Sequence, residues 1–358
     1  MHPDYPVRRV GLERSGRNFA LKSESVFVIG GVKMRRFRKG KYGGRAFSHI
    51  WNAFKQLNPK NVEAESKRVV RVGVLGPLEL LKDTAAFLLG EDVEAYGQAG
   101  DVLVLLPTPL EDSAFSLLPR CDVVLQSRNY RDTLPGVASE RIFAFSSKED
   151  LPSVIREVLQ EVDLGYAHIP LARVLPAFRS EVALGIIQGI SIENAIFVAS
   201  TSLGNVIPNP LQPLTSVAES LGDLVVLTAN QLRMLFRLAA AYNQSLGYKQ
   251  QVPEVLSIVV AAFGWRSVAR ELAGKIPLGA GVVSKAAIAF AGTWALGDGI
   301  AYYYTTGKHL SKEELRQRFE AAYETGKSAA EVVVAKFKES YAPSPAAENR
   351  PGRIVRSI

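Results

Sequence analysis

The stretch Val69-Val-Arg-Val-Gly-Val-Leu75, followed directly by Gly76-Pro-Leu-Glu-Leu-Leu-Lys82, decides the fold of the central part of the chain. The first run is short, apolar and rich in valine, which predicts a buried strand, and the apolar spacing over 78–89 predicts a helix. Further strands are predicted at 101–106, 122–125 and 141–145, and a last helix from a cap at Ser147 or Asp150 to about Val162. Strands that alternate with helices imply a parallel sheet covered on both faces, so we expect a small α/β domain at 69–165.

The chain beyond this domain reads as almost entirely helical. Long apolar stretches occur at 182–203, 223–241, 253–273 and 278–304, with breaks such as Ile207–Pro213 between them. Ser311-Lys-Glu-Glu314 has the pattern of a capping box, which predicts a polar helix to about Ser340. The tail at 342–358 is expected to be disordered. The expected fold class is therefore α/β plus all-α, a small parallel-sheet domain followed by a mostly helical domain at 166–308 and a polar helix at 309–341.

The composition excludes several classes of protein. With 47% hydrophobic and 22% charged residues among 358, the chain is not intrinsically disordered. Its single cysteine, Cys121, excludes an internal disulfide framework and a multi-cysteine zinc site, and it fits a reducing compartment. The four histidines are scattered, so no metal site is expected. Residues 1–20 contain no apolar core of signal-peptide length, which argues against secretion.

The positive charge is concentrated before the predicted folded domains. The formal net charge is +8, yet residues 1–68 hold 16 Lys and Arg against 5 Asp and Glu, whereas residues 69–358 hold 27 against 30. A basic arm carries most of the excess, and its candidate residues for binding an anionic surface are Lys33, Arg35, Arg36, Arg38, Lys39, Lys41 and Arg45. Periodic apolar residues at 45–57 predict a helix after the arm, and a loop is expected at 58–61. Arm and helix suit an anionic membrane surface. The alternatives are a helix packed on the next domain and an arm that binds nucleic acid.

The sequence leaves membrane insertion open. A span needs about 20 consecutive apolar residues. Glu193 interrupts the stretch at 182–203, and Arg233 and Arg237 interrupt the next one. No segment therefore reads as a clean span, although several glycines of the last stretch would let helices pack closely. The two arginines are expected to pair with carboxylates such as Glu219 or Asp223, or to face lipid headgroups.

The residues after the first predicted strand resemble an altered phosphate-binding loop. Such a loop reads G-x-x-x-x-G-K-[ST]: its glycines let backbone N–H groups wrap the phosphates, its lysine reaches the outer phosphates, and its hydroxyl holds magnesium. Gly76 and Lys82 occupy their expected positions, with Thr84 nearby. Leu81, however, replaces the second glycine and adds bulk where the backbone must approach phosphate. Asp83 replaces the hydroxyl residue and adds a like charge.

Three later motifs also resemble motifs of small GTPases, and each of them departs from the GTPase pattern. Where those enzymes carry Asp-x-x-Gly for magnesium and the terminal phosphate, this chain has Pro107-Thr-Pro-Leu110. Asn129-Tyr-Arg-Asp132 matches the guanine-reading N-K-x-D except at Tyr130, and Ser146-Ser-Lys148 resembles the S-A-K element. The alternative interpretation is a loop Asn/Asp pair and a serine that caps a helix.

In their order, these elements resemble an Era-like GTPase domain that has lost its phosphate and magnesium contacts. Phosphoryl transfer depends on holding phosphates and metal in place, so the resemblance implies a pseudo-GTPase without activity. No cofactor is expected. The alternative is a residual guanine-nucleotide binder or slow GTPase that would use GTP and magnesium. Its nucleotide-binding remnants would be Gly76, Lys82, Thr84, Asn129, Asp132, Ser146 and Lys148.

The helical half resembles the YcjF-like helical domain, a bacterial domain of unknown function that commonly follows Era-like GTPase domains. The resemblance covers about residues 180–308 and rests on motifs such as Phe263-Gly-Trp-Arg266 and Ala289-Phe-Ala-Gly-Thr-Trp-Ala-Leu-Gly297. It implies a bacterial cytoplasmic protein, associated with the inner membrane or with a partner protein. Self-association through the helical domain is a further expectation.

No catalytic residue is predicted. Gly185-Ile-Ile-Gln-Gly189 and Ser200-Thr-Ser202 have no histidine nearby, and His168 precedes Pro170 in what reads as a linker. We therefore expect a non-enzymatic, membrane-associated or partner-docking protein with a degenerate GTPase-like domain. Residual nucleotide binding is the first alternative, and nucleic-acid binding through the basic arm is the second.

Overall fold

The computed structural model describes residues 28–29, 32–33, 59–90, 93–161, 168–204, 212–246 and 281–341. The chain divides into two compact units, Met1–Lys41 and Tyr42–Ile358. In the first unit, strands β1 (Val28–Ile29) and β2 (Val32–Lys33) pair antiparallel. The other basic-arm residues, the predicted helix at 45–57, the stretch at 253–273 and the tail at 342–358 lie outside the described residues.

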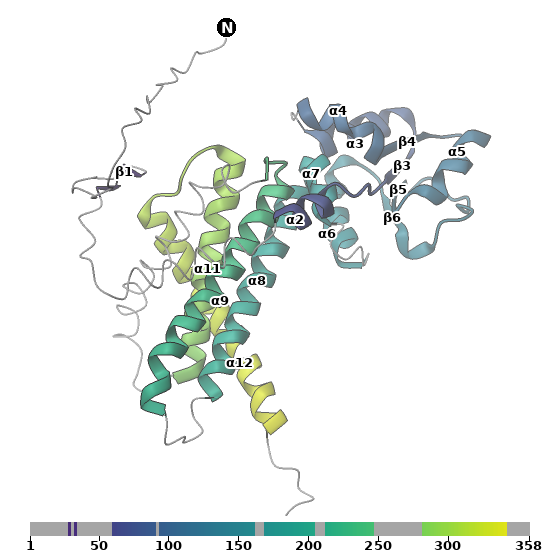
Figure 1. Ribbon diagram of the computed structural model, residues 1–358. Coiled ribbons are helices and arrows are strands. Elements are labelled where there is room, and N and C mark those ends of the chain that lie inside the picture. The colour runs from purple at the N-terminus through teal and green to yellow at the C-terminus, as the bar shows by residue number, and fades with distance from the viewer. Residues whose placement is uncertain are drawn as a thin grey trace, which may run out of the picture. The chain divides into compact units, whose positions relative to one another are not determined.

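A four-stranded parallel sheet forms the centre of the α/β part (Figure 1). Its strands are β3 (Val72–Gly76), β4 (Leu103–Pro107), β5 (Val123–Ser127) and β6 (Ile142–Phe145). Their order across the sheet is β4-β3-β5-β6, with Val74 paired to Leu105 on one side and to Leu125 on the other. The chain therefore switches direction at β3 and β5, the point where doubly wound sheets usually bind ligands.

Both faces of the sheet are covered, as the sequence predicted. Val72 and Val74 pack beneath α3 (Leu78–Leu89) and α6 (Leu151–Glu161). Leu75 and Leu106 face the opposite side, toward α5 (Asp112–Leu117) and the 3-10 helix η1 (Leu118–Arg120). Successive residues of a strand point to opposite faces, which explains the alternation.

Sequence reasoning missed two helices here, α4 and α5, and misplaced some strand ends. Helix α4 (Val93–Val102) runs directly into β4, so Asp101 and Val102 are helical rather than the start of a strand. Gly97 and Gly100 lower the helix propensity of α4 and conceal it in the sequence. The first strand begins at Val72 instead of Val69.

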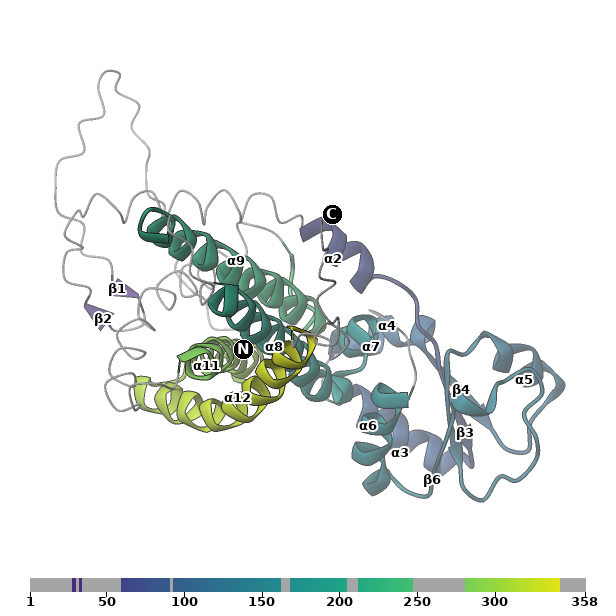
Figure 2. The ribbon, with the colours of Figure 1, turned by 90° about the horizontal axis from the view of Figure 1, so that it is seen from below.

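Four long helices build the described part of the helical bundle: α8 (Arg179–Gly204), α9 (Gln212–Ala241), α11 (Gly281–Thr306) and α12 (Lys312–Tyr341). Helices α8 and α11 lie at the centre, and each of them contacts the other three helices of the bundle (Figures 1 and 2). The hydrogen bonds and packing contacts between side chains of these helices show that α9 runs parallel to α11. Helix α8 runs antiparallel to both. The capping box is confirmed, since the Ser311 backbone N–H donates to Glu314 Oε2 at 2.7 Å and the Glu314 N–H donates to Ser311 Oγ at 3.2 Å.

Two glycines allow the bundle helices to approach closely. A Cβ at Gly297 would stand 2.7 Å from Ile187 Cγ1 of α8 and 2.8 Å from Met234 Sδ of α9. A Cβ at Gly326 of α12 would stand 2.8 Å from the Phe290 ring. Real Cβ atoms do not tolerate such distances, so these positions require glycine in this packing.

Two short helices correct the sequence-based expectations. The expected loop at 58–61 is wrong from Pro59 onward, because α2 (Pro59–Ser66) begins at this proline, which is favoured in a first helical turn. His168 is not in a linker, since it begins α7 (His168–Val174). Helix α2 packs on α7 and α9, and α7 also contacts α4 and α8.

One continuous hydrophobic core joins the sheet to the bundle. It includes Val74 and Phe145 of the sheet, Leu171 of α7 and Leu235 of α9, all essentially inaccessible to solvent. The α/β and helical parts therefore share buried contacts rather than only a connecting segment.

Candidate functional site

The carboxyl edge of the sheet carries the predicted nucleotide-binding remnants. Helix α3 begins at Leu78, only one residue after β3 ends at Gly76, so no wide loop separates strand from helix. The intervening residue is Pro77, which has no N–H to offer a phosphate. A Cβ at Gly76 would meet Leu80 Cδ2 at 3.1 Å and Ser127 Cβ at 3.2 Å. Side chains of α3 and β5 thus fill the edge between the two central strands.

The structure does not bring Lys82 and Thr84 together. Two residues apart on α3, they point roughly 200° apart around the helix axis. Lys82 lies at the surface, where its Nζ is 3.2 Å from Glu79 Oε1. Thr84 is fully buried, and its Oγ1 has no hydrogen-bond partner among the described residues.

The remaining remnants lie in two separate segments, the turn after β5 and the segment before α6. Asn129 and Asp132 lie exposed in the turn after β5, where the Gln126 side-chain amide donates to the Tyr130 carbonyl at 2.8 Å. Burial, with a contribution from Asp132, raises the pKa of Tyr130.

Ser146 and Lys148 lie just before α6, and Lys148 begins the short 3-10 helix η3 (Lys148–Asp150) that leads into it. The Ser146 backbone N–H donates to Asp150 Oδ2 at 2.8 Å, and Ser147 forms a capping box with Asp150. A hydrogen bond from Ser147 lowers the pKa of Glu149. This region therefore has the geometry of a helix cap.

The residues present at this edge do not fit GTP and magnesium. Leu81, which stands at the second glycine of the motif, is 1% exposed and packs in the core of the sheet. Pro107, which the sequence resemblance aligns with the magnesium-supporting aspartate, ends β4 and has neither a carboxylate nor an N–H. Among the described residues, no three acidic, histidine or cysteine side chains gather closely enough to hold a metal ion.

A buried polar layer crosses the bundle. Asn194 of α8 donates to Thr293 Oγ1 of α11 at 2.8 Å, and its own Oδ1 accepts from Asn230 of α9 at 2.8 Å. Asn194 and Thr293 are almost completely buried. One helical turn away from Asn230, Arg233 pairs with Glu193 of α8. Arg233 is therefore paired with a carboxylate, as expected, but the partner is Glu193 of α8 and not Glu219 or Asp223.

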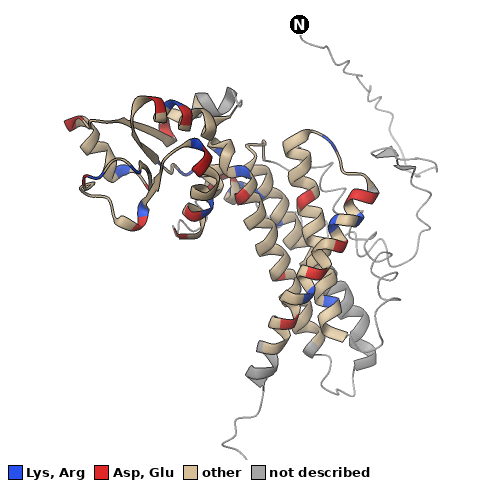
Figure 3. Ribbon diagram, turned by 180° about the vertical axis from the view of Figure 1, so that it is seen from behind, with Lys and Arg blue, Asp and Glu red and all other residues tan. Residues whose placement is uncertain are grey.

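By length and composition, one helix within the described ranges could cross a bilayer. It spans Pro176–Ser202, with a mean hydropathy of 1.7, and 44% of its apolar window is buried inside the protein. The sequence predicted no clean span because Glu193 interrupts this stretch, and Glu193 is the one charged residue between 182 and 203. A core helix of a soluble bundle meets the same criteria, so the finding is weak evidence for insertion. Figure 3 shows few charged positions along this helix compared with the α/β part.

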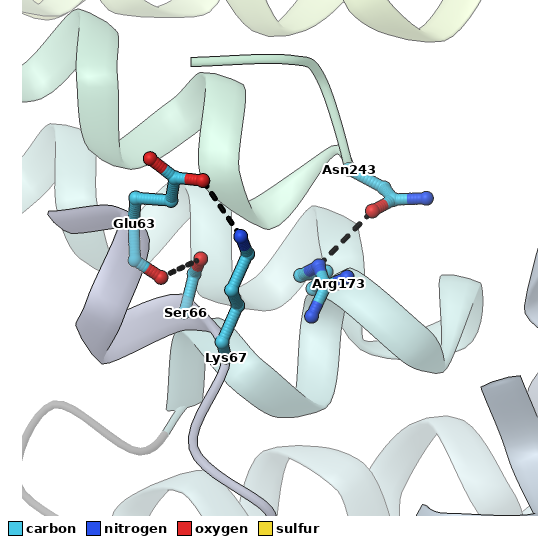
Figure 4. Close-up of polar contacts among 5 residues, drawn as sticks. All are labelled: Glu63, Ser66, Lys67, Arg173 and Asn243. Atoms are coloured by element: carbon cyan, nitrogen blue, oxygen red, sulfur yellow. Dashed lines mark hydrogen bonds and ion pairs between the residues drawn. The ribbon is translucent and has the colours of Figure 1, made fainter. Parts of the chain in front are cut away.

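Two sets of polar contacts lie where α2 packs on α7 and α9: one is local to α2, and the other joins α7 to the end of α9 (Figure 4). Lys67 pairs with Glu63 at 2.6 Å within α2, and the Lys67 ammonium lowers the pKa of Glu63. Alongside, Arg173 of α7 donates to Asn243 Oδ1 at 3.1 Å. Asn243 ends α9 in the left-handed conformation, with φ of 55°, which asparagine tolerates well. Burial raises the pKa of Glu65, and the nearby Arg237 offsets part of that rise.

A cavity of about 540 Å³ lies where α6, α7, α8 and α9 meet. Its polar wall includes Arg156 of α6, Glu181 of α8 and Arg237 of α9, and its apolar wall includes Leu159 and Leu184. Sequence reasoning missed this cavity, because its residues are separated by up to 81 positions and share no motif.

Comparisons of the sequence with protein-family models, with curated proteins and with solved structures gave no match. The Era-like and YcjF-like resemblances therefore stay predictions.

Proposed function

We propose that this protein is a non-enzymatic, membrane-associated docking protein with a degenerate GTPase-like domain. The observation that carries the proposal is the closed carboxyl edge of the sheet. A single proline, Pro77, stands between β3 and α3, and the side chains of Leu80 and Ser127 leave no room for more than a glycine at the end of β3. The sheet order and the shared core support a scaffold role, because the sheet braces the bundle through α7.

Titration with a fluorescent GTP analogue and magnesium tests the degenerate site. We expect no saturable, magnesium-dependent binding, and the same result for Lys82→Ala. Lys67→Ala is the matched control, since Lys67 also forms an exposed pair with a glutamate of its own helix. Saturable binding that Lys82→Ala weakens and Lys67→Ala preserves would establish the residual nucleotide binder instead.

Membrane association rests on the apolar α8 and on the basic arm. Only Arg179, Glu181 and Glu193 are charged among the 26 residues of α8. Cell fractionation should place the protein in the membrane pellet. Release by high salt would assign the attachment to the arm, and release by detergent alone would assign it to the helices. Recovery in the soluble fraction at low salt would contradict the proposal.

A further inference from the structure

The cavity between α6 and α8 combines a cationic wall with an apolar one. Helix α6 lies beside the beginning of α8 (Figures 1 and 2), residues of α7 and α9 also line the cavity, and the cavity is open to solvent along α8, where Leu184 and Gly185 are exposed. Its volume of about 540 Å³ falls in the range of small-molecule sites, roughly 300–1,000 Å³. The cavity lies away from the carboxyl edge of the sheet, so it is separate from the nucleotide-binding remnants.

The cationic wall has an arginine that is available to a ligand. The Arg156 side chain is 56% exposed, and its contact with Glu181 is long, 3.9 Å from Nε to Oε1. The same Nε donates to the Pro152 carbonyl at 3.2 Å, which fixes the side chain along α6. Arg237 also lines the cavity, and its positive charge acts on Glu65 of α2 as well. Planar guanidinium groups recognise carboxylates and phosphates.

The apolar wall includes an exposed glycine of α8. A Cβ at Gly185 of α8 would meet no atom within 4 Å, so this position contributes empty space to the cavity. Leu184, beside it, is 44% exposed. Glycine inside a helix lowers its stability by about 1 kcal/mol relative to alanine. Unlike Gly297, Gly185 gives the fold no close packing in return.

We propose that this cavity binds a single-chain anionic amphiphile, with its charged head on Arg156 and its alkyl chain along Leu159, Leu184 and Gly185. The shared chemistry is one anionic group on one apolar chain, and its source is either a free fatty acid or the head and chain of an anionic phospholipid. The site goes beyond the docking role, since a monomeric ligand can occupy it without a bilayer.

The test measures binding of oleate below its aggregation threshold to the full chain, by displacement of a fluorescent fatty acid. Gly185→Leu should reduce affinity at least tenfold by filling the apolar wall. Gly189→Leu is the matched control: it lies one turn further on the same helix, also meets no atom within 4 Å, and does not line the cavity. We expect it to change affinity by less than about twofold.

The charged wall is tested in both directions. Arg156→Gln should weaken oleate binding about tenfold, because it removes a charge-assisted hydrogen bond. Glu181→Gln should tighten binding about threefold by removing the competing carboxylate. Oleyl alcohol and inorganic phosphate should each bind at least tenfold more weakly than oleate. Circular dichroism spectra should show that all variants are folded.

Three results would overturn the proposal. Wild-type affinity in Gly185→Leu would exclude the cavity, and equal losses in Gly185→Leu and Gly189→Leu would assign binding to the outer face of α8. Equal affinity for oleyl alcohol would exclude recognition of the anion. Vesicles of phosphatidylglycerol and phosphatidylcholine separate the sources: competition by the former alone indicates a phospholipid, and no competition indicates a free fatty acid. Recovery of the protein in the soluble fraction would contradict membrane association and would leave oleate binding unaffected. The two proposals can therefore fail separately.

Discussion

At the scale of single residues, Gly297 sets the distance between three helices. Gly297→Ala should lower the free energy of unfolding by about 1–2 kcal/mol, since overpacking against Ile187 and Met234 outweighs the gain in helix propensity. Gly189→Ala, where a Cβ meets open space, should instead raise stability by about 0.5–1 kcal/mol. Urea denaturation followed by circular dichroism measures both. A stabilised Gly297→Ala would show that the helices are not in close contact.

Asn194 is the central residue of the buried polar layer. Asn194→Ala should cost about 2–3 kcal/mol, because it removes two interhelical hydrogen bonds and leaves Thr293 and Asn230 without these partners. Asn129→Ala, in an exposed turn, should change stability by less than about 0.5 kcal/mol. Equal unfolding midpoints for the two variants would mean that the polar layer contributes nothing to stability.

At the scale of elements, the capping box makes the start of α12 sensitive to acid. Hydrogen bonds from Ser311 lower the pKa of Glu314 below its ordinary value of 4.5. A lowered pKa in the folded state stabilises the helix above the unfolded pKa, and this contribution is lost as pH falls through the folded pKa. Amide exchange in the first turn of α12 should therefore rise, beyond its intrinsic pH dependence, below about pH 4.5. Glu314→Gln should abolish this change, and Glu320→Gln, on the same helix, should retain it.

The elements also show how far the sequence predicts this structure. Buried strands and capped helices leave local signals, so the sheet and the start of α12 were predicted close to their positions. Helix α4 was not predicted because its two glycines weaken the helical pattern. Helix α2 was not predicted because Pro59 is typical of a loop. The cavity left no signal, since Arg156 and Arg237 meet only after the bundle has folded.

At the scale of the whole molecule, the shared core predicts that the α/β part and the bundle unfold together. Val74→Ala removes buried atoms from the sheet and should cost about 2 kcal/mol. Because Val74 belongs to the same core as Leu235 of α9, amide exchange should rise in α9 by the same factor as in the sheet. Val332→Ala, which removes an exposed side chain of α12, is the control and should leave both unchanged. Faster exchange confined to the sheet would show that the bundle folds independently, and the degenerate domain would then be a separate module rather than a brace for the helices.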